Sequence, residues 1–274
     1  MMRYFLVLIF GACCLFASAD VIDFENTSAD LSLFNYDTGR PTITSNPWSS
    51  SIYTSALGVG GSNGVTAVQG NNLISVMYQN PIEIDNGVRT ISLDFNFPTL
   101  ATFQAKVRVG FTGESPGELP GVGSGSTVLF VEPSGNNKVT ASLVAIDQTD
   151  TIDNYSADSS PIPMSINHWY QMTFSQTIVG DTSTIWGSIS DIGVNGTSIP
   201  TTIWSDTEAQ GLSFPASLMN DGFSYGGFST DVIAASGYFP LDNFVTPEPS
   251  CIFLFGLFML AGSRRHICGG RKFG

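Results

Sequence analysis

The sequence predicts an all-β protein whose folded part is a single antiparallel β-sandwich domain. Apolar and polar residues alternate along many short segments, which is the period of a strand with one buried face. Clusters of Gly, Pro, Asn and Ser separate these segments. No window of about 11 to 18 residues shows the spacing and capping residues of an amphipathic helix. About a dozen short strands divided by turns favour two packed sheets, as in a sandwich or jelly roll.

Two adjoining segments show the clearest alternation. The turn residues Pro98-Thr99-Leu100 lie between them, so we expect the two segments to pair antiparallel with one buried face. The residues expected on that face are Ile91, Leu93, Phe95 and Phe97 in the first segment and Phe103, Ala105, Val107, Val109 and Phe111 in the second.

A hairpin is predicted farther along the chain. Tyr170, Met172, Phe174 and Ile178 share one face of a strand, and the turn Gly180-Asp181 leads into a second strand at 184–189. The same alternation predicts further strands at 21–24, 73–78, 127–131, 139–145, 223–229 and 232–245.

The first 19 residues have the pattern of a secretory signal peptide. Arg3 provides the basic start, 4–16 form an apolar run, and the small residues Ala17 and Ala19 precede the expected cleavage point. The apolar run is shorter than the roughly 20 residues of a spanning helix, which argues against a membrane anchor. The folded domain is therefore expected to cover residues 20–246.

The last 28 residues, 247–274, have a different pattern. Pro247-Glu248-Pro249 ends the folded domain because proline neither continues a strand nor fits inside a helix. The apolar run 251–262 follows, and a basic segment at 264–272 comes after it. A helix over 251–262 spans about 18 Å, less than the ~30 Å hydrocarbon core, and the basic residues behind it would hold that side in the cytoplasm.

This tail resembles the PEP-CTERM sorting signal of Gram-negative bacteria. The resemblance rests on the Pro-Glu-Pro tripeptide, the short transmembrane helix, the basic end and the signal peptide at the other terminus. It implies export by the general secretion machinery, transient anchoring in the inner membrane and processing by exosortase, a membrane-embedded cysteine transpeptidase. It also implies a final location in the cell envelope or extracellular matrix, where many members of this family accompany polysaccharide. A GPI signal is the rival interpretation, but such a signal ends in its apolar segment.

Cysteine usage agrees with export. The four cysteines are Cys13, Cys14, Cys251 and Cys268, so none lies in residues 20–246. A disulfide framework, a thiol nucleophile and a zinc-thiolate site are therefore excluded there. The alternative interpretation of the N-terminal segment is a lipoprotein signal, in which Cys13 would mark the cleavage position.

The folded domain is strongly acidic. Residues 20–246 contain five basic residues and 22 carboxylates, a formal charge of −17. Such a surface repels phosphate, so nucleic acid is excluded as an expected partner.

Acidic residues in the first and last predicted strands suggest a structural Ca²⁺ site. The first strand carries Asp23 and Glu25, and the last carries Asp242. Jelly-roll carbohydrate-binding modules often have acidic residues at these places, and Ca²⁺ takes about six to eight hard oxygen ligands. We expect Glu25 and Asp242 as ligands and Asp23 as a further candidate. An acidic strand that simply faces water is the alternative.

The layout of the strands resembles the concanavalin A-like, laminin G-like jelly rolls of exported bacterial proteins. Polysaccharide is the expected ligand, and Trp48 and Trp204, in polar and turn-rich surroundings, are the aromatic residues expected to stack on sugars. Packing in the core or between the sheets is the alternative for these aromatic residues. The expected function is non-enzymatic, that of an exosortase-sorted envelope or matrix protein. A structural or adhesive surface protein is one alternative.

A glycan-active hydrolase or lyase is the other alternative. Glu83-Ile84-Asp85 matches half of an acidic glycosidase motif, but Asn86 follows where a second Glu is needed. The single histidine of the domain, His168, has no Gly-x-Ser-x-Gly elbow to accompany it. No catalytic residue is therefore assigned.

Overall fold

The computed structural model describes the greater part of one compact unit, Val21–Pro247. The described residues are 21–25, 30, 33–36, 53–54, 58–67, 72–78, 82–83, 87–96, 105–112, 125–135, 137–146, 155–218, 223–232 and 239–246. The predicted signal peptide and sorting signal lie outside them and stay predictions. Within the described ranges no helix has the length and apolar character needed to cross a membrane.

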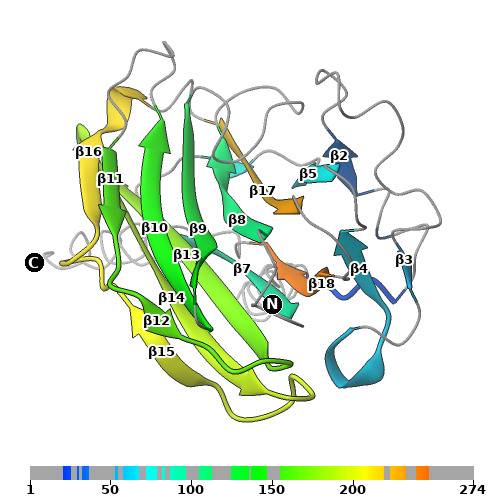
Figure 1. Cartoon of the computed structure of the whole chain (residues 1–274). Helices are drawn as coiled ribbons and strands as arrows, with labels where there is room; N and C mark the ends of the chain where they lie inside the picture. The colour runs from blue at the N-terminus through cyan, green and yellow to red at the C-terminus, as the bar shows by residue number, and fades with distance from the viewer. Residues whose placement is uncertain are drawn as a thin grey trace, which may run out of the picture. The chain divides into compact units, whose positions relative to one another are not determined.

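The described residues form two nine-stranded antiparallel sheets, which we name sheet A and sheet B (Figure 1). In order across sheet A lie β15 (Thr201–Ser205), β14 (Thr182–Gly193), β13 (Trp169–Val179), β7 (Arg89–Asn96), β18 (Phe239–Val245), β4 (Gly64–Ala67) and β3 (Tyr53–Thr54), with β1 (Val21–Ile22) beside β18 and β16 (Leu212–Pro215) beside β14. In order across sheet B lie β11 (Tyr155–Asp158), β10 (Lys138–Ile146), β9 (Ser126–Gly135), β8 (Ala105–Thr112), β17 (Phe223–Val232), β5 (Asn72–Tyr78) and β2 (Phe34–Tyr36), with β12 (Ile162–Pro163) beside β10 and β6 (Ile82–Glu83) beside β17. Two 3-10 turns, η1 (Val59–Gly61) and η2 (Ala216–Leu218), complete the described elements.

The core lies between the two sheets and is built from the alternating apolar residues. In β7 and β8 the core residues are Ile91, Leu93 and Phe95 and Val107, Val109 and Phe111, all fully buried. Aromatic contacts join the sheets: the ring centroids of Phe111 and Phe174 are 5.7 Å apart, and those of Phe228 and Phe244 are 5.4 Å apart. The predicted all-β sandwich is thus confirmed.

The predicted pairing of the two adjoining segments is wrong. β7 pairs with β13 and β18 in sheet A, whereas β8 pairs with β9 and β17 in sheet B. Alternation shows which face of a strand is buried, but two strands that face each other across the core alternate in the same way as two that are hydrogen-bonded. Phe97, Phe103 and the intervening Pro98-Thr99-Leu100 lie outside the described residues.

The predicted hairpin is confirmed. Val179 pairs with Thr182 across the two-residue turn Gly180-Asp181, and Gly180 has the positive φ (59°) that such a turn needs. The strand predicted at 232–245 combined residues of two strands, because Val232 belongs to β17 in sheet B and Phe239–Val245 form β18 in sheet A.

The first and last strands lie side by side. Val21 pairs with Val245 and Ile22 with Phe244, so the chain leaves sheet A next to the place where it enters. This pairing brings the segments that carry Glu25 and Asp242 close together.

Candidate functional site

Glu25 and Asp242 bind the same loop, residues 58–63. The Val59 amide donates to Asp242 Oδ2 at 2.8 Å, and Ser62 Oγ donates to the same oxygen at 3.0 Å. At the end of the loop the Asn63 amide donates to Glu25 Oε1 at 2.9 Å, and Asn63 Nδ2 lies 3.3 Å from Glu25 Oε2. The structure therefore brings two of the three predicted metal ligands together through one loop.

The sequence of this loop suits its close approach to Asp242. A Cβ at Gly58 would lie 2.6 Å from Asp242 Oδ2 and 2.2 Å from the Asn63 carbonyl oxygen, so only glycine fits. Gly60 and Gly61 have positive φ values of 67° and 84°, which favour glycine. The glycine-rich stretch is thus required by the turn that wraps the carboxylate.

Asp23 contributes differently from the other two predicted ligands. Its Oδ1 accepts the backbone amide of Glu25 at 3.2 Å, so this carboxylate turns back on its own segment. The described residues contain no group of three or more His, Cys, Asp and Glu side chains that could hold a metal ion. Any ion at this place would therefore need carbonyl or water oxygens in addition to Glu25 and Asp242.

Asp94 is a member of this site that sequence reasoning missed. It lies on β7 directly opposite Asp242 on β18, and Asp94 and Asp242 are only 4% and 1% exposed. Asn243 joins the two carboxylates: its amide donates to Asp242 Oδ1 at 2.8 Å, and its Nδ2 donates to Asp94 Oδ2 at 2.9 Å. Gln171 Nε2 donates to Asp94 Oδ1 at 3.2 Å. The alternation marks Asp94 as outward-facing, but only the register of β7 and β18 places it beside Asp242.

Both carboxylates are harder to ionise than a carboxylate in water. Burial raises the pKa of Asp94 to about 6, although the hydrogen bonds from Asn243 and Gln171 oppose the shift. Burial also raises the pKa of Asp242 to about 6 against the hydrogen bonds from Val59, Asn243 and Ser62, and the charge of Asp94 adds to the rise. The pair is thus electrostatically coupled.

Trp204 lies on the core side of its strand. It pairs with Ile189, a fully buried core residue, and its half-buried side chain packs against the core. Trp48 lies outside the described residues, so its role in ligand binding stays a prediction.

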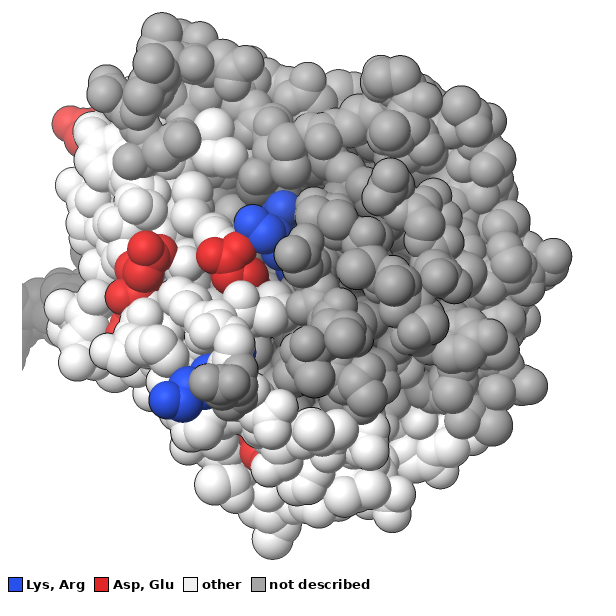
Figure 2. Space-filling model, viewed as in Figure 1, with Lys and Arg blue, Asp and Glu red and all other residues white. Residues whose placement is uncertain are grey.

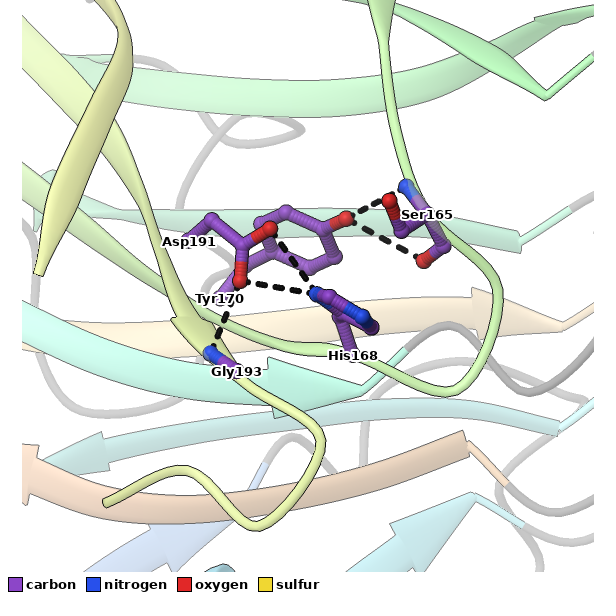
Figure 3. Close-up of polar contacts among 5 residues, drawn as sticks. All are labelled: Ser165, His168, Tyr170, Asp191 and Gly193. Atoms are coloured by element: carbon purple, nitrogen blue, oxygen red, sulfur yellow. Dashed lines mark hydrogen bonds and ion pairs between the residues drawn. The ribbon is translucent and has the colours of Figure 1, made fainter. Parts of the chain in front are cut away.

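His168 belongs to a set of polar contacts at the end of the β13–β14 hairpin far from its turn (Figure 3). Its Nδ1 lies 3.0 and 2.9 Å from the two carboxylate oxygens of Asp191, and Asp191 Oδ1 also accepts the Gly193 amide at 2.7 Å. Nearby, the Tyr170 hydroxyl accepts the Ser165 amide at 2.6 Å and donates to the Ser165 carbonyl at 3.1 Å. These contacts tie the segments flanking the hairpin to its strands, which is a structural role.

The outer face of sheet B combines an aromatic ring with charged groups. Phe130 alternates with the core residues Leu129 and Val131, so its half-buried ring points away from the core. Lys106 Nζ lies 5.9 Å from the centre of this ring and 2.7 Å from Glu132 Oε2, and Arg108 is the register partner of Phe130 on β8. Figure 2 shows basic and acidic side chains close together on this face of the molecule. We call Lys106, Arg108, Phe130 and Glu132 the Phe130 face.

Comparison with solved structures identifies the fold. The globular domain of T. cruzi calreticulin superposes with a TM-score of 0.52 at 9% identity, covering 90% of this chain and 94% of that one. The potassium-bound form of the Emp46p carbohydrate recognition domain gives 0.50 at 11% identity, covering 81% and 91% of the two chains. The chain shares the β-sandwich fold of these two domains. At these identities the likeness establishes the fold alone, and the fold agrees with the concanavalin A-like resemblance of the strand layout. No family model and no curated protein matches the sequence.

Proposed function

We propose that this chain is an exported, non-catalytic glycan-binding protein of the cell envelope or extracellular matrix. The observation that carries the proposal is the Phe130 face, on a fold shared with a domain whose name is carbohydrate recognition domain. Sorting by exosortase, through the tail 247–274, accounts for how such a domain reaches the envelope.

The chemistry of the Phe130 face suits a sugar. The apolar face of a pyranose ring stacks on Phe130, while the charged groups around it bind hydroxyls. Lys106 and Arg108 only donate hydrogen bonds, and the Glu132 carboxylate only accepts them. The face therefore offers donors and acceptors to sugar hydroxyls, which can both accept and donate. The ion pair of Lys106 and Glu132 holds two of these groups in place beside the ring.

The carboxylates favour binding over hydrolysis. Glycoside hydrolysis needs two carboxyl groups roughly 5 to 10 Å apart that reach the substrate. Asp94 and Asp242 are neighbours, but both are buried and already accept hydrogen bonds from protein donors. His168 is engaged with Asp191, and Glu132 with Lys106.

A structural Ca²⁺ ion would have two candidate carboxylate ligands near the ends of the domain. Glu25 and Asp242 supply hard carboxylate oxygens on the two sides of loop 58–63, and a bound ion would replace the hydrogen bonds that the loop amides donate to these oxygens. When bound, the ion would tie β1, β18 and the loop together. The Emp46p structure, by its name, contains potassium, so a metal ion is compatible with this fold.

A glycan array tests the main proposal. The full-length chain is applied with and without EGTA, and Phe130→Ala is compared with Ile199→Ala, which truncates an exposed apolar side chain elsewhere. We expect Phe130→Ala to weaken binding about tenfold, equivalent to about 1.4 kcal/mol, and Ile199→Ala to leave it unchanged. No binding to any glycan, or equal binding by both variants, would contradict the proposal.

The sorting proposal has its own test. Intact-mass spectrometry of the protein recovered from the envelope should show that residues 1–19 and part of the tail 247–274 are missing. Recovery with Met1 and Gly274 still attached would contradict processing at both ends.

A further inference from the structure

The outer face of sheet A carries hydroxyl groups in register. In its central row, Ser92 on β7, Thr173 on β13, Ser188 on β14 and Ser205 on β15 are successive cross-strand partners. These residues alternate with the buried core residues Leu93, Met172 and Ile189, so their hydroxyls point away from the core. We call the outward side chains of β7, β13, β14, β15 and β16 the hydroxyl face.

The rows on either side continue the pattern. Thr90 Oγ1 and Ser175 Oγ are 2.9 Å apart, Thr184 Oγ1 and Ser213 Oγ are 2.9 Å apart, and Ser190 Oγ and Thr202 Oγ1 are 3.4 Å apart. Strands lie about 4.8 Å apart and alternate residues about 6.8 Å apart along a strand, so the hydroxyls form a regular, pre-organised array.

The hydroxyl face is nearly free of charge in an acidic domain. Among its described residues Asp94 is the one ionisable side chain, and it is 4% exposed and hydrogen-bonded by Gln171 and Asn243. The acidic Asp206 and Glu208 belong to the turn between β15 and β16, which lies beside Trp186, because the Asp206 amide donates to the Gly187 carbonyl at 2.9 Å. An ionic partner finds no exposed counter-charge in the described hydroxyl rows themselves, whereas a neutral partner with hydroxyl groups finds donors and acceptors there.

Trp186 supplies an aromatic surface within the array. It faces outward on β14 opposite Ser175, and its side chain is half-buried. β16 pairs with residues 182–185 of β14 and β15 with residues 188–191, so Trp186 lies in the gap between these two edge strands. Gly211 lies directly beside Trp186 in this gap, because a Cβ at position 211 would lie 3.1 Å from Trp186 Cβ.

We propose that the hydroxyl face, with Trp186 as its aromatic contact, binds an extended neutral polysaccharide. A neutral chain presents ring faces that stack on the indole and hydroxyls that match the rows. Because the groups sit on rigid paired strands, little conformational entropy is lost on binding. The inference goes beyond the proposed function, since the hydroxyl face and the Phe130 face lie on opposite sides of the sandwich, and together they would let one molecule link two polysaccharide chains.

Binding to insoluble neutral glucans tests the inference. The full-length chain is mixed with cellulose or β-1,3-glucan particles at low and high NaCl, and the bound fraction is measured. We expect binding that changes little with salt, because no ion pairs form. Trp186→Ala and Ser188→Lys should each weaken it at least tenfold, whereas Ser156→Lys, the same change on β11 of sheet B, should leave it unchanged.

Two further comparisons separate the possible failures. Thermal unfolding of each variant establishes that it is folded. Phe130→Ala should retain glucan binding. If Phe130→Ala loses glucan binding and Trp186→Ala retains it, the glucan binds to sheet B and the inference is overturned. No binding of the unaltered chain to either glucan would also overturn it, while array binding sensitive to Phe130→Ala would leave the proposed function standing.

Discussion

Asp94 and Asp242 are ionisable side chains placed where water hardly reaches them. Their pKa values of about 6 exceed the value of about 3.9 for an unfolded aspartate, so the folded state binds protons more tightly than the unfolded state. The stabilising contribution of these protons is fully present below about pH 4 and is lost as the pH rises through about 6. Near neutral pH the pair therefore destabilises the fold.

Asp94→Asn should remove part of this cost. At about pH 7.5 we expect the free energy of unfolding to rise by about 1 kcal/mol, because the gain from removing a buried charge exceeds the loss of one accepted hydrogen bond. At about pH 3.5 the difference should disappear, because Asp94 is then mostly protonated in both the folded and the unfolded state. Urea unfolding at the two pH values measures this, with the exposed Asp158→Asn as control. Equal effects at both pH values would contradict the assignment.

Individual residues also differ in how far sequence reasoning could place them. Glu25 and Asp242 could be placed near each other because they belong to the first and last predicted strands, which the fold pairs. Asp94 could not be identified, since its neighbour on β18 depends on register. The position of Trp204 on the core side follows from a register shift between Ile189 and Ser190, which no local pattern encodes.

At the scale of elements, the β13–β14 hairpin is the part of the fold most directly specified by local sequence. Its turn needs a left-handed residue, and Gly180 has a φ of 59°, while a Cβ added to it would meet no atom within 4 Å. We expect Gly180→Ala to lower stability by about 1 kcal/mol through backbone strain alone, and Gly180→Asn to cost less because Asn tolerates this region. Thermal unfolding compares the two. Equal stability of Gly180→Ala and the unaltered chain would show that the turn relaxes.

The pairing of β7 and β8 shows the opposite case. Their local patterns were correct, since Ile91, Leu93 and Phe95 and Val107, Val109 and Phe111 are all buried. Their predicted partners were wrong, because the hydrogen-bonded neighbours of β7 come from β13 and β18, about 80 and about 150 residues farther along the chain. Long-range partners follow from the packing of the whole sandwich and leave no trace in a single segment.

At the scale of the whole molecule, bound Ca²⁺ should stabilise the fold by linking β1, β18 and loop 58–63. Bound at about 100 times its dissociation constant, a ligand specific for the folded state adds about 2.7 kcal/mol to stability. We expect EGTA to lower the unfolding temperature and Glu25→Gln to abolish that dependence, while Asp23→Asn has a smaller effect because Asp23 caps its own segment. Differential scanning calorimetry with and without CaCl₂ measures this. If the unfolding temperature is the same with and without Ca²⁺, hydrogen bonds alone hold loop 58–63 in place.

The position of β18 has a mechanical consequence. This last strand is hydrogen-bonded to β1, β4 and β7, so it is enclosed by sheet A and is not an edge strand. Tension applied through the chain beyond Thr246, as on a tethered molecule in flowing liquid, would pull β18 along its own axis. Many interstrand bonds would then share the load in shear, and the domain would resist such a pull better than one whose final strand can be peeled from an edge.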